Sequence, residues 1–201
     1  MTYLPSWILT LEEAIFTAKS RLYEKLGKIC DIVIFVSPNN QVLDIIETID
    51  HEKFREELWI TNEELEEKTR RKGFIAFLIY FENQPIAFLY GYQNPENTSG
   101  FYLDEVATRI EGKGVGKILI VLSLIYCVEA GYTHVTLYTE NSDEKGRRLV
   151  EFYEHIVFQL IENENEYGIL MRYDIKEEKL LQLYNRIMIK EGGPFPPFLA
   201  K

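Results

Sequence analysis

Helical periodicity marks both ends of the chain. Apolar residues recur at helical spacing along Thr10–Leu26, and Thr10 followed by Glu13 forms a capping-box pattern at its start. Glu177–Ile189 is a second helical segment. Between them, Asp50–Lys72 is helical and heavily charged, with another capping pattern beginning at Thr61. This pattern predicts one or two helices with a solvated face, and a site for a cation is the alternative use of the charges.

Strand-like runs fill the first half of the chain. Ile32–Val36 and Val42–Ile46 are short runs rich in branched residues, and the turn residues between them predict a β-hairpin. Three further runs follow with short connections, which is typical of an antiparallel meander. These runs are Phe74–Phe81, Pro85–Tyr92 and Phe101–Ala107.

The second half of the chain alternates between helix and strand. Val115–Ala130 is apolar almost all round, which predicts a buried helix, and His134–Thr139 follows as a strand. A strand-helix-strand unit of this kind implies parallel pairing of its strands. A helix over Gly146–His155 and strands at Phe158–Ile161 and Tyr167–Tyr173 complete the order. The pattern predicts an α+β domain with a mixed central sheet, followed by a Pro-rich extended tail.

Composition narrows the class of protein. The chain has 201 residues, of which 46% are hydrophobic, which favours one domain with a substantial core. The longest apolar run is too short to span a bilayer, and no secretory signal is visible, so we expect a cytoplasmic protein. The formal charge of -10 argues against nucleic acid as the main partner and suits a cationic substrate. The same acidity would also serve solubility alone.

The glycine-rich stretch from Glu111 to Leu119 is the strongest chemical signal. Gly112, Gly114 and Gly116 follow a strand-like run and lead straight into the apolar helix. Glycine lets the backbone bend and approach a ligand closely, and the start of a helix presents unpaired amides and a positive dipole end. This combination favours a phosphate group. Cys30 and Cys127 have no metal spacing, so no metal site is expected.

Two motifs in this order make the chain similar to the Gcn5-related N-acetyltransferase (GNAT) superfamily, which takes an acetyl group from acetyl-CoA. The first runs from Leu103 to Lys117 and resembles the family's fourth strand and pyrophosphate loop. The second, from Leu149 to Phe158, resembles its Tyr-Glu-Lys-x-Gly-Phe pattern. The resemblance covers roughly Val42–Tyr173 and implies the acyl-CoA N-acyltransferase fold, a three-stranded meander followed by β-α-β-α-β. It divides the chain into an N-terminal extension (1–40), an acetyltransferase domain (41–174) and a C-terminal helix and tail (175–201), all packed as one unit.

The family's Gln/Arg-x-x-Gly-x-Gly pattern fits this chain in two frames. One begins at Arg109, and the other begins at Glu111 and ends at Gly114 and Gly116. We favour the second frame because its glycines lead directly into the helix. Glu111 then stands where the family has Arg or Gln, an unfavourable charge beside a pyrophosphate, which Lys113, Lys117 and Arg109 would offset. Val157 stands where the family has Gly.

The resemblance also implies a set of site residues. Those expected to bind acetyl-CoA are Val106, Ala107, Thr108, Glu111, Gly112, Lys113, Gly114, Val115, Gly116, Lys117 and Asn141. Lys145, Arg147 and Arg148 would either reach the 3′-phosphate or only solvate a helix start. Tyr153 falls where the family's phenol protonates the departing thiolate. Strand alternation places Asp104 on one face with Tyr102 and Val106, and Glu105 on the other. Asp104, acting through water, is our candidate for the general base.

The function implied is N-acetyl transfer from acetyl-CoA to a primary amine of a small molecule or peptide. A non-catalytic acyl-CoA-binding module and a protein-interaction module on the same scaffold are the alternatives. The two terminal extensions either border the acceptor site or form a homodimer contact. The identity and size of the acceptor are not visible in the sequence.

Overall fold

The computed structural model describes residues 9–143 and 145–189. These residues form a seven-stranded sheet in the order β1-β2-β3-β4-β5-β7-β6. Its strands are β1 (Cys30–Phe35), β2 (Ile75–Phe81), β3 (Gln84–Gln93), β4 (Gly100–Thr108), β5 (His134–Thr139), β6 (Gln159–Asn165) and β7 (Gly168–Asp174). All neighbouring strands pair antiparallel except β4 and β5, which pair parallel. The predicted mixed sheet and its central meander of β2, β3 and β4 are therefore confirmed.

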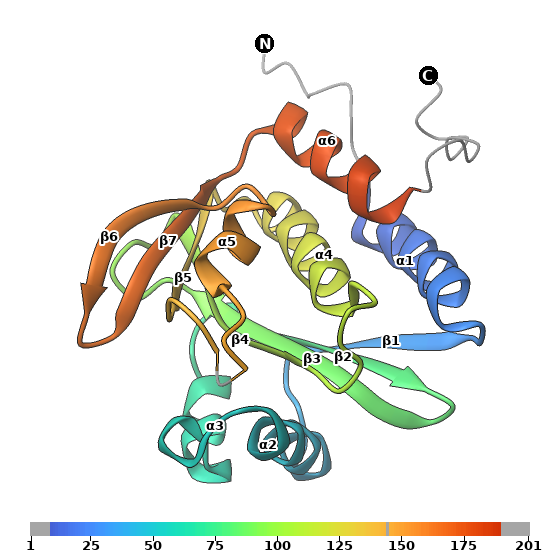
Figure 1. The fold of residues 1–201 in the computed structure, drawn as a ribbon, viewed down its shortest axis with the longest axis horizontal. Coiled ribbons are helices and arrows are strands. Elements are labelled where there is room, and N and C mark those ends of the chain that lie inside the picture. The colour runs from blue at the N-terminus through green and yellow to red at the C-terminus, as the bar shows by residue number, and fades with distance from the viewer. Residues whose placement is uncertain (1–8, 144, 190–201) are drawn as a thin grey trace.

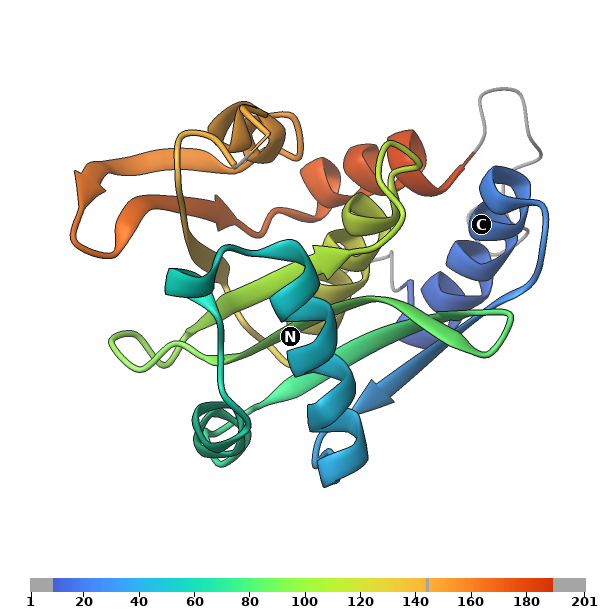
Figure 2. The same cartoon turned by 60° about the horizontal axis from the view of Figure 1, so that its bottom comes forward.

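Helices cover both faces of the sheet (Figures 1 and 2). The helices are α1 (Leu11–Leu26), α2 (Asn40–Lys53), α3 (Asn62–Thr69), α4 (Val115–Glu129), α5 (Leu149–Glu154) and α6 (Glu177–Met188), with a 3-10 turn at Glu56–Leu58. In Figure 1, α1, α4 and α6 lie above the sheet, and α2 and α3 lie below it. Each face has its own buried core, and α4 contributes many of the apolar side chains of the first. In the described part of the chain no helix is both long and apolar enough to cross a membrane.

The predicted hairpin at Val42–Ile46 is wrong, because this segment lies inside α2. Its turn-like start is a helix cap instead, since Asn39 Oδ1 accepts a hydrogen bond from the Val42 amide at 3.1 Å. Val42, Leu43, Ile46 and Ile49 then fall at helical spacing and are buried against the sheet. Tertiary burial of this stripe outweighs the strand preference of branched residues.

The other helix predictions need only their boundaries corrected. The capping boxes at Thr10 and Thr61 are both present, at the starts of α1 and α3. The helix expected over Gly146–His155 is shorter, because only Leu149–Glu154 is helical. The predicted tail at 192–198 lies outside the described residues.

A β-bulge in β4 changes which side chains face which layer. Tyr90 pairs with Glu105 and Gly91 pairs with Leu103, so Asp104 is an extra residue on β4. Asp104 and Glu105 consequently both face α2 and α3. The predicted alternation, with Asp104 beside Val106 and Glu105 opposite, is therefore wrong. Val106 packs instead against the core on the α4 side.

Candidate active site

A cavity of about 1140 Å³ opens where β4 and β5 separate. Their parallel register covers only Gly100–Tyr102 paired with His134–Thr136. Beyond this register the two strands diverge, and the cavity is lined by 103–108 of β4 and 137–140 at the end of β5. Backbone groups of β4 along this stretch have no strand partner on the β5 side, so they are available to a ligand.

The glycine loop forms one end of the cavity. Gly112 and Gly114 have φ of 73° and 76°, a left-handed conformation that favours glycine. Gly114 is the N-cap of α4 and makes no side-chain cap, so the first amides of the helix point into the loop unpaired. The helix thus begins at Val115, as the favoured motif frame requires.

Glu111 is surrounded by cations. Its Oε1 lies 2.7 Å from Lys145 Nζ and 3.6 Å from Lys53 Nζ, and its Oε2 lies 2.9 Å from Arg147. The hydrogen bond from Lys145, followed by the charge of Arg147, holds the pKa of the Glu111 carboxyl below its usual range. The negative charge is therefore compensated, and it gathers basic side chains from α2 and from the loop after β5 at the mouth of the cavity.

A second group of cations has no such compensation. Lys25, at the end of α1, lines the cavity with Lys113 and Lys117, and none of them forms an ion pair with another described residue. Burial lowers the pKa of Lys25, and the charges of Arg21, Lys113 and Lys117 lower it further. Like charges held together beside helix amides are a binding site for a polyanion.

Arg109 does not belong to this site. Its guanidinium forms two hydrogen bonds to the Glu52 carboxylate, at 2.7 and 2.6 Å, and a third to the Pro85 carbonyl. The expectation that Arg109 offsets the charge of Glu111 is therefore wrong.

Tyr153 projects from α5 into the cavity wall. Its ring packs edge-on against Phe152 and Phe158, at centroid distances of 5.1 and 5.8 Å. Burial raises the pKa of the phenol, and the charge of Glu105 raises it further. The phenol therefore keeps its proton at neutral pH and is available as a proton donor.

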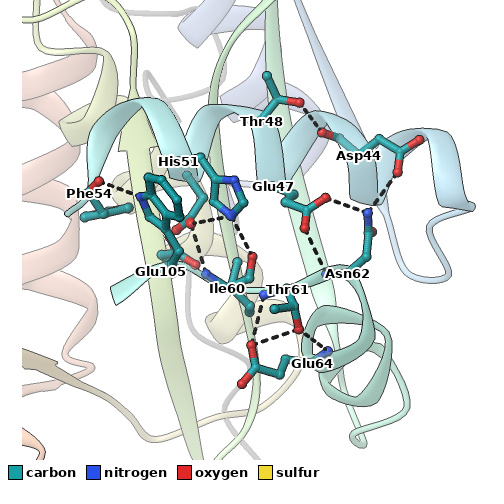
Figure 3. Close-up of polar contacts among 12 residues, drawn as sticks. Asp44, Glu47, Thr48, His51, Phe54, Ile60, Thr61, Asn62, Glu64 and Glu105 are labelled. Atoms are coloured by element: carbon teal, nitrogen blue, oxygen red, sulfur yellow. Dashed lines mark hydrogen bonds and ion pairs between the residues drawn. The ribbon is translucent and has the colours of Figure 1, made fainter. Parts of the chain in front are cut away.

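Acidic side chains line the wall formed by β4. Asp104 Oδ2 lies 2.7 Å from Lys68 Nζ on α3. Glu105 Oε2 accepts a hydrogen bond from the Tyr90 hydroxyl at 2.6 Å. Behind Glu105 lies Asp50 of α2, whose side chain is fully buried and accepts a hydrogen bond from the Ile60 amide at 3.0 Å. Figure 3 shows Glu105 beside the segment that connects α2 to α3.

The structure gathers nearly all the expected site residues in one place. Every residue expected to bind acetyl-CoA lines the cavity except Asn141, and so do Asp104 and Tyr153. Asn141 is exposed, and its carbonyl accepts a hydrogen bond from the Leu149 amide at 2.9 Å. The sequence reading missed the cavity-lining residues Arg21, Lys25, Lys53, Lys68, Glu105 and Arg186, which come mainly from helices outside the two motifs.

Potential metal ligands lie apart from one another in the described part of the chain. No cluster of three His, Cys, Asp or Glu side chains suited to a metal ion occurs within 9–143 and 145–189. His51 stacks on Trp59 at 4.4 Å, and His134 lies buried in β5, so each has a packing role.

Comparison with known families decides the classification. Residues 39–157 match the family described as "Acetyltransferase (GNAT) family". The chain belongs to this family. A comparison with curated proteins finds no match. Membership of the GNAT family supports an acyltransferase activity.

Solved structures show the same fold at low sequence identity. The PaiA N-acetyltransferase from Thermoplasma acidophilum, in complex with coenzyme A, is 16% identical, with a TM-score of 0.58 over 72% of this chain and 99% of that one. Aminoglycoside 6′-acetyltransferase type Ii is 19% identical, with a TM-score of 0.62 over 73% and 97%. The ribosomal-protein-S18-alanine N-acetyltransferase from Escherichia coli is 14% identical, with a TM-score of 0.57 over 73% and 95%. The last two are named for different acceptors, an aminoglycoside and an alanine of a ribosomal protein, so the fold alone does not select an acceptor.

Proposed function

We propose that this GNAT-family protein transfers the acetyl group of acetyl-CoA to a primary amine. The single observation that carries the proposal is the cavity between β4 and β5, which ends at the glycine loop and its uncompensated cations. The exposed edge of β4 matches the amide-rich arm of acetyl-CoA. The free helix amides and the cluster of lysines match its phosphates. Acetyl-CoA supplies an activated acetyl thioester and a thiol leaving group.

Cofactor contacts follow from this fit. Val106, Ala107 and Thr108 would present their backbone groups to the pantetheine arm and the acetyl carbonyl. The loop from Glu111 to Lys117 would bind the pyrophosphate through its amides and lysines. A contact from Asn141 stays a prediction, since this residue lies outside the cavity lining.

Tyr153 is the proposed acid. Direct attack of an amine on the thioester expels a thiolate, which needs a proton. The phenol lines the cavity and is kept protonated by its surroundings, so it suits this role. The carboxylates of β4 line the same cavity.

Those carboxylates favour a cationic acceptor. An amine is protonated in water at neutral pH, and a wall with Asp104 and Glu105 attracts it. Asp104 as the general base stays a prediction. Its ion pair with Lys68 means that an incoming ammonium group would compete with that lysine. A small amine and a peptide amine both fit this description.

The rival reading of a non-catalytic acyl-CoA module depended on the charge of Glu111. Because Lys53, Lys145 and Arg147 compensate this charge, the carboxylate is no obstacle to a pyrophosphate. The terminal helices α1 and α6 contribute Arg21, Lys25 and Arg186 to the cavity, which favours a role at the site. A homodimer and a cytoplasmic location stay predictions.

Two measurements test the proposal. Calorimetric titration with acetyl-CoA and with coenzyme A should show saturable binding. A panel of small amines and peptides, with release of the free thiol as the readout, should then identify acceptors. Binding without turnover on any amine would leave only the non-catalytic module. Failure to bind either compound would refute both readings.

A further inference from the structure

A lysine of the chain itself reaches into the cavity. Lys68 lies on α3, the short charged helix beneath the sheet in Figure 1. Residues three apart share a face of a helix, so Lys68 lies on the same face as Leu65, which is fully buried. Glu66 and Glu67, between them in sequence, are exposed. The Lys68 side chain is 25% exposed and lines the cavity, so the helix directs a primary amine into the proposed active site.

The Lys68 ammonium has the surroundings that a cationic acceptor would need. Its Nζ lies 2.7 Å from Asp104 Oδ2, on a side chain that is 11% exposed. The same nitrogen lies 3.5 Å from the Tyr90 hydroxyl and 5.6 Å from the centroid of the Tyr90 ring. A carboxylate and the face of an aromatic ring both attract an ammonium group. Lys68 therefore occupies a position that the amine of an external acceptor would take.

The acetyl group of acetyl-CoA would lie within reach of this amine. In the proposed function its carbonyl is held by the backbone of β4 from Val106 onward, two residues beyond Asp104. Two residues of a strand span about 7 Å. The lysine side chain is a flexible four-carbon stem, so a rotation of this side chain can bring its nitrogen to the carbonyl while α3 stays in place.

The other lysines of the cavity lining are placed for phosphates. Lys113 and Lys117 belong to the glycine loop, and Lys53 pairs with Glu111 of the same loop. A Cβ added at Gly114 would lie 3.5 Å from Lys25 Nζ, so this amine also lies at the loop. Lys68, by contrast, has its ion pair with the wall formed by β4.

We propose that Lys68 is an internal acceptor, which takes the acetyl group of acetyl-CoA bound to the same chain when no external amine occupies the site. This inference rests on the proposed function. An amine held beside the thioester reacts at an effective concentration far above that of a free amine, which favours transfer within the chain. If the pair of Lys68 with Asp104 were instead a fixed structural contact, the lysine would stay unmodified.

The transfer balances in atoms and electrons. The Lys68 ammonium first loses one proton to water. The lone pair of the neutral nitrogen forms a bond to the acetyl carbon, and the bond from that carbon to sulfur breaks. A second proton of the nitrogen ends on the sulfur, by way of Tyr153 in the proposed function. The products are Nε-acetylated Lys68, the free thiol of coenzyme A and one proton.

Mass spectrometry tests the proposal directly. The full-length protein is incubated with acetyl-CoA that carries a carbon-13 acetyl group, without any added amine, and its peptides are then analysed. Lys68 should gain one labelled acetyl group, at an initial rate about 10²-fold or more above that of Lys72. Lys72 is the matched control, because it lies four residues further on, is exposed and does not line the cavity. Direct chemical acetylation would favour the exposed Lys72, and that pattern would overturn the proposal.

Two changes to the same assay show where the transfer occurs. Excess unacetylated coenzyme A should block labelling of Lys68 and leave the slow labelling of Lys72 unchanged. The rate of Lys68 labelling per chain should not depend on protein concentration, whereas a rate that rises in proportion to concentration would indicate transfer between molecules and overturn the proposal. Lys68→Arg keeps a positive charge beside Asp104 and cannot be acetylated in this way, so it provides the blank for the assignment of the label.

The amine panel separates this inference from the proposed function. Turnover of an external amine with no label on Lys68 would overturn the inference alone. If neither an external amine nor Lys68 is acetylated, the proposed function and the inference both fail. Tyr153→Phe should slow the labelling of Lys68 and leave that of Lys72 unchanged, because only the first uses the active site. Equal slowing of both lysines would contradict the proposal.

Discussion

Lys145 Nζ lies 2.7 Å from Glu111 Oε1, which joins the loop after β5 to the start of the phosphate loop. Lys53 and Arg147 bind the same carboxylate. Glu111 therefore organises a cluster of cations that would otherwise repel one another, and its departure from the family pattern has a structural cause.

Glu111→Arg, which restores the residue type of the family, should destabilise the free protein. The change places a fourth cation among Lys53, Lys145 and Arg147 and removes their counter-ion. The melting temperature should fall, and the loss should shrink as added salt screens the charges. Thermal unfolding at low and high salt is the measurement. Glu57→Arg, on the exposed 3-10 turn, is the control, and an equal fall in both variants would contradict the explanation.

The glycine loop can be predicted from the sequence, but the site residues that come from other parts of the chain cannot. Gly112, Gly114 and the start of α4 were predictable because a turn, a helix start and an apolar run are local signals. Asp104 and Glu105 were placed on opposite faces because strand alternation was assumed throughout, and the bulge that reverses it depends on pairing with β3. Asp50 belongs to a helix predicted in part as a strand, and only tertiary packing brings it to Glu105.

Lys25 is likewise a site residue that local sequence signals do not reveal. It lies ninety residues or so before the glycine loop in sequence order, and only the packing of α1 beside α4 brings it near Gly114. No sequence pattern marks it, since its helix is outside the matched family region.

Lys25→Ala should weaken binding of coenzyme A about tenfold. This lysine forms no ion pair with a described residue, and a charge-assisted hydrogen bond to phosphate contributes about 1.5–3 kcal/mol. Calorimetry at two salt concentrations measures the loss and the smaller salt dependence that should accompany it. Lys19→Ala is the matched control on the same helix, because Lys19 pairs with Asp31 instead. Equal affinities for wild type and Lys25→Ala would exclude this contact.

Tyr153→Phe should lower kcat by about 10²-fold with little change in KM, because it removes the acid and keeps the ring packing. Steady-state kinetics across a range of pH is the measurement. Tyr138→Phe removes a hydroxyl from another tyrosine that lines the same cavity and should change kcat little. If the two variants behave alike, the proton for the thiolate comes from elsewhere.

The neighbouring carboxyl side chains of Asp50 and Glu105 should make the protein less stable as pH rises. The folded state raises the pKa of Glu105 above its unfolded value of about 4.3, so the folded chain binds more protons between those two values. The free energy of unfolding therefore falls with increasing pH in that window, by about 1.4 kcal/mol for each unit of the shift. Urea unfolding at a series of pH values should show this slope, and Asp50→Asn should flatten it. An unchanged slope in the variant would mean that other groups cause the dependence.

At Gly116 a substitution should affect folding stability and ligand binding in opposite directions. Unlike Gly112 and Gly114, it has no positive φ, and a Cβ added there would meet no atom within 4 Å. Alanine at a helical position without strain is more stable than glycine by about 0.5–1 kcal/mol. Gly116→Ala should therefore raise the free energy of unfolding of the free protein and at the same time weaken binding of coenzyme A, since the added methyl group stands before the helix amides.

Gly114→Ala, in contrast, should lower stability as well as affinity, because its φ of 76° strains any side chain. Urea unfolding and calorimetry on the two variants test this together. If Gly116→Ala binds coenzyme A as tightly as the wild type does, the phosphates do not approach the first turn of α4.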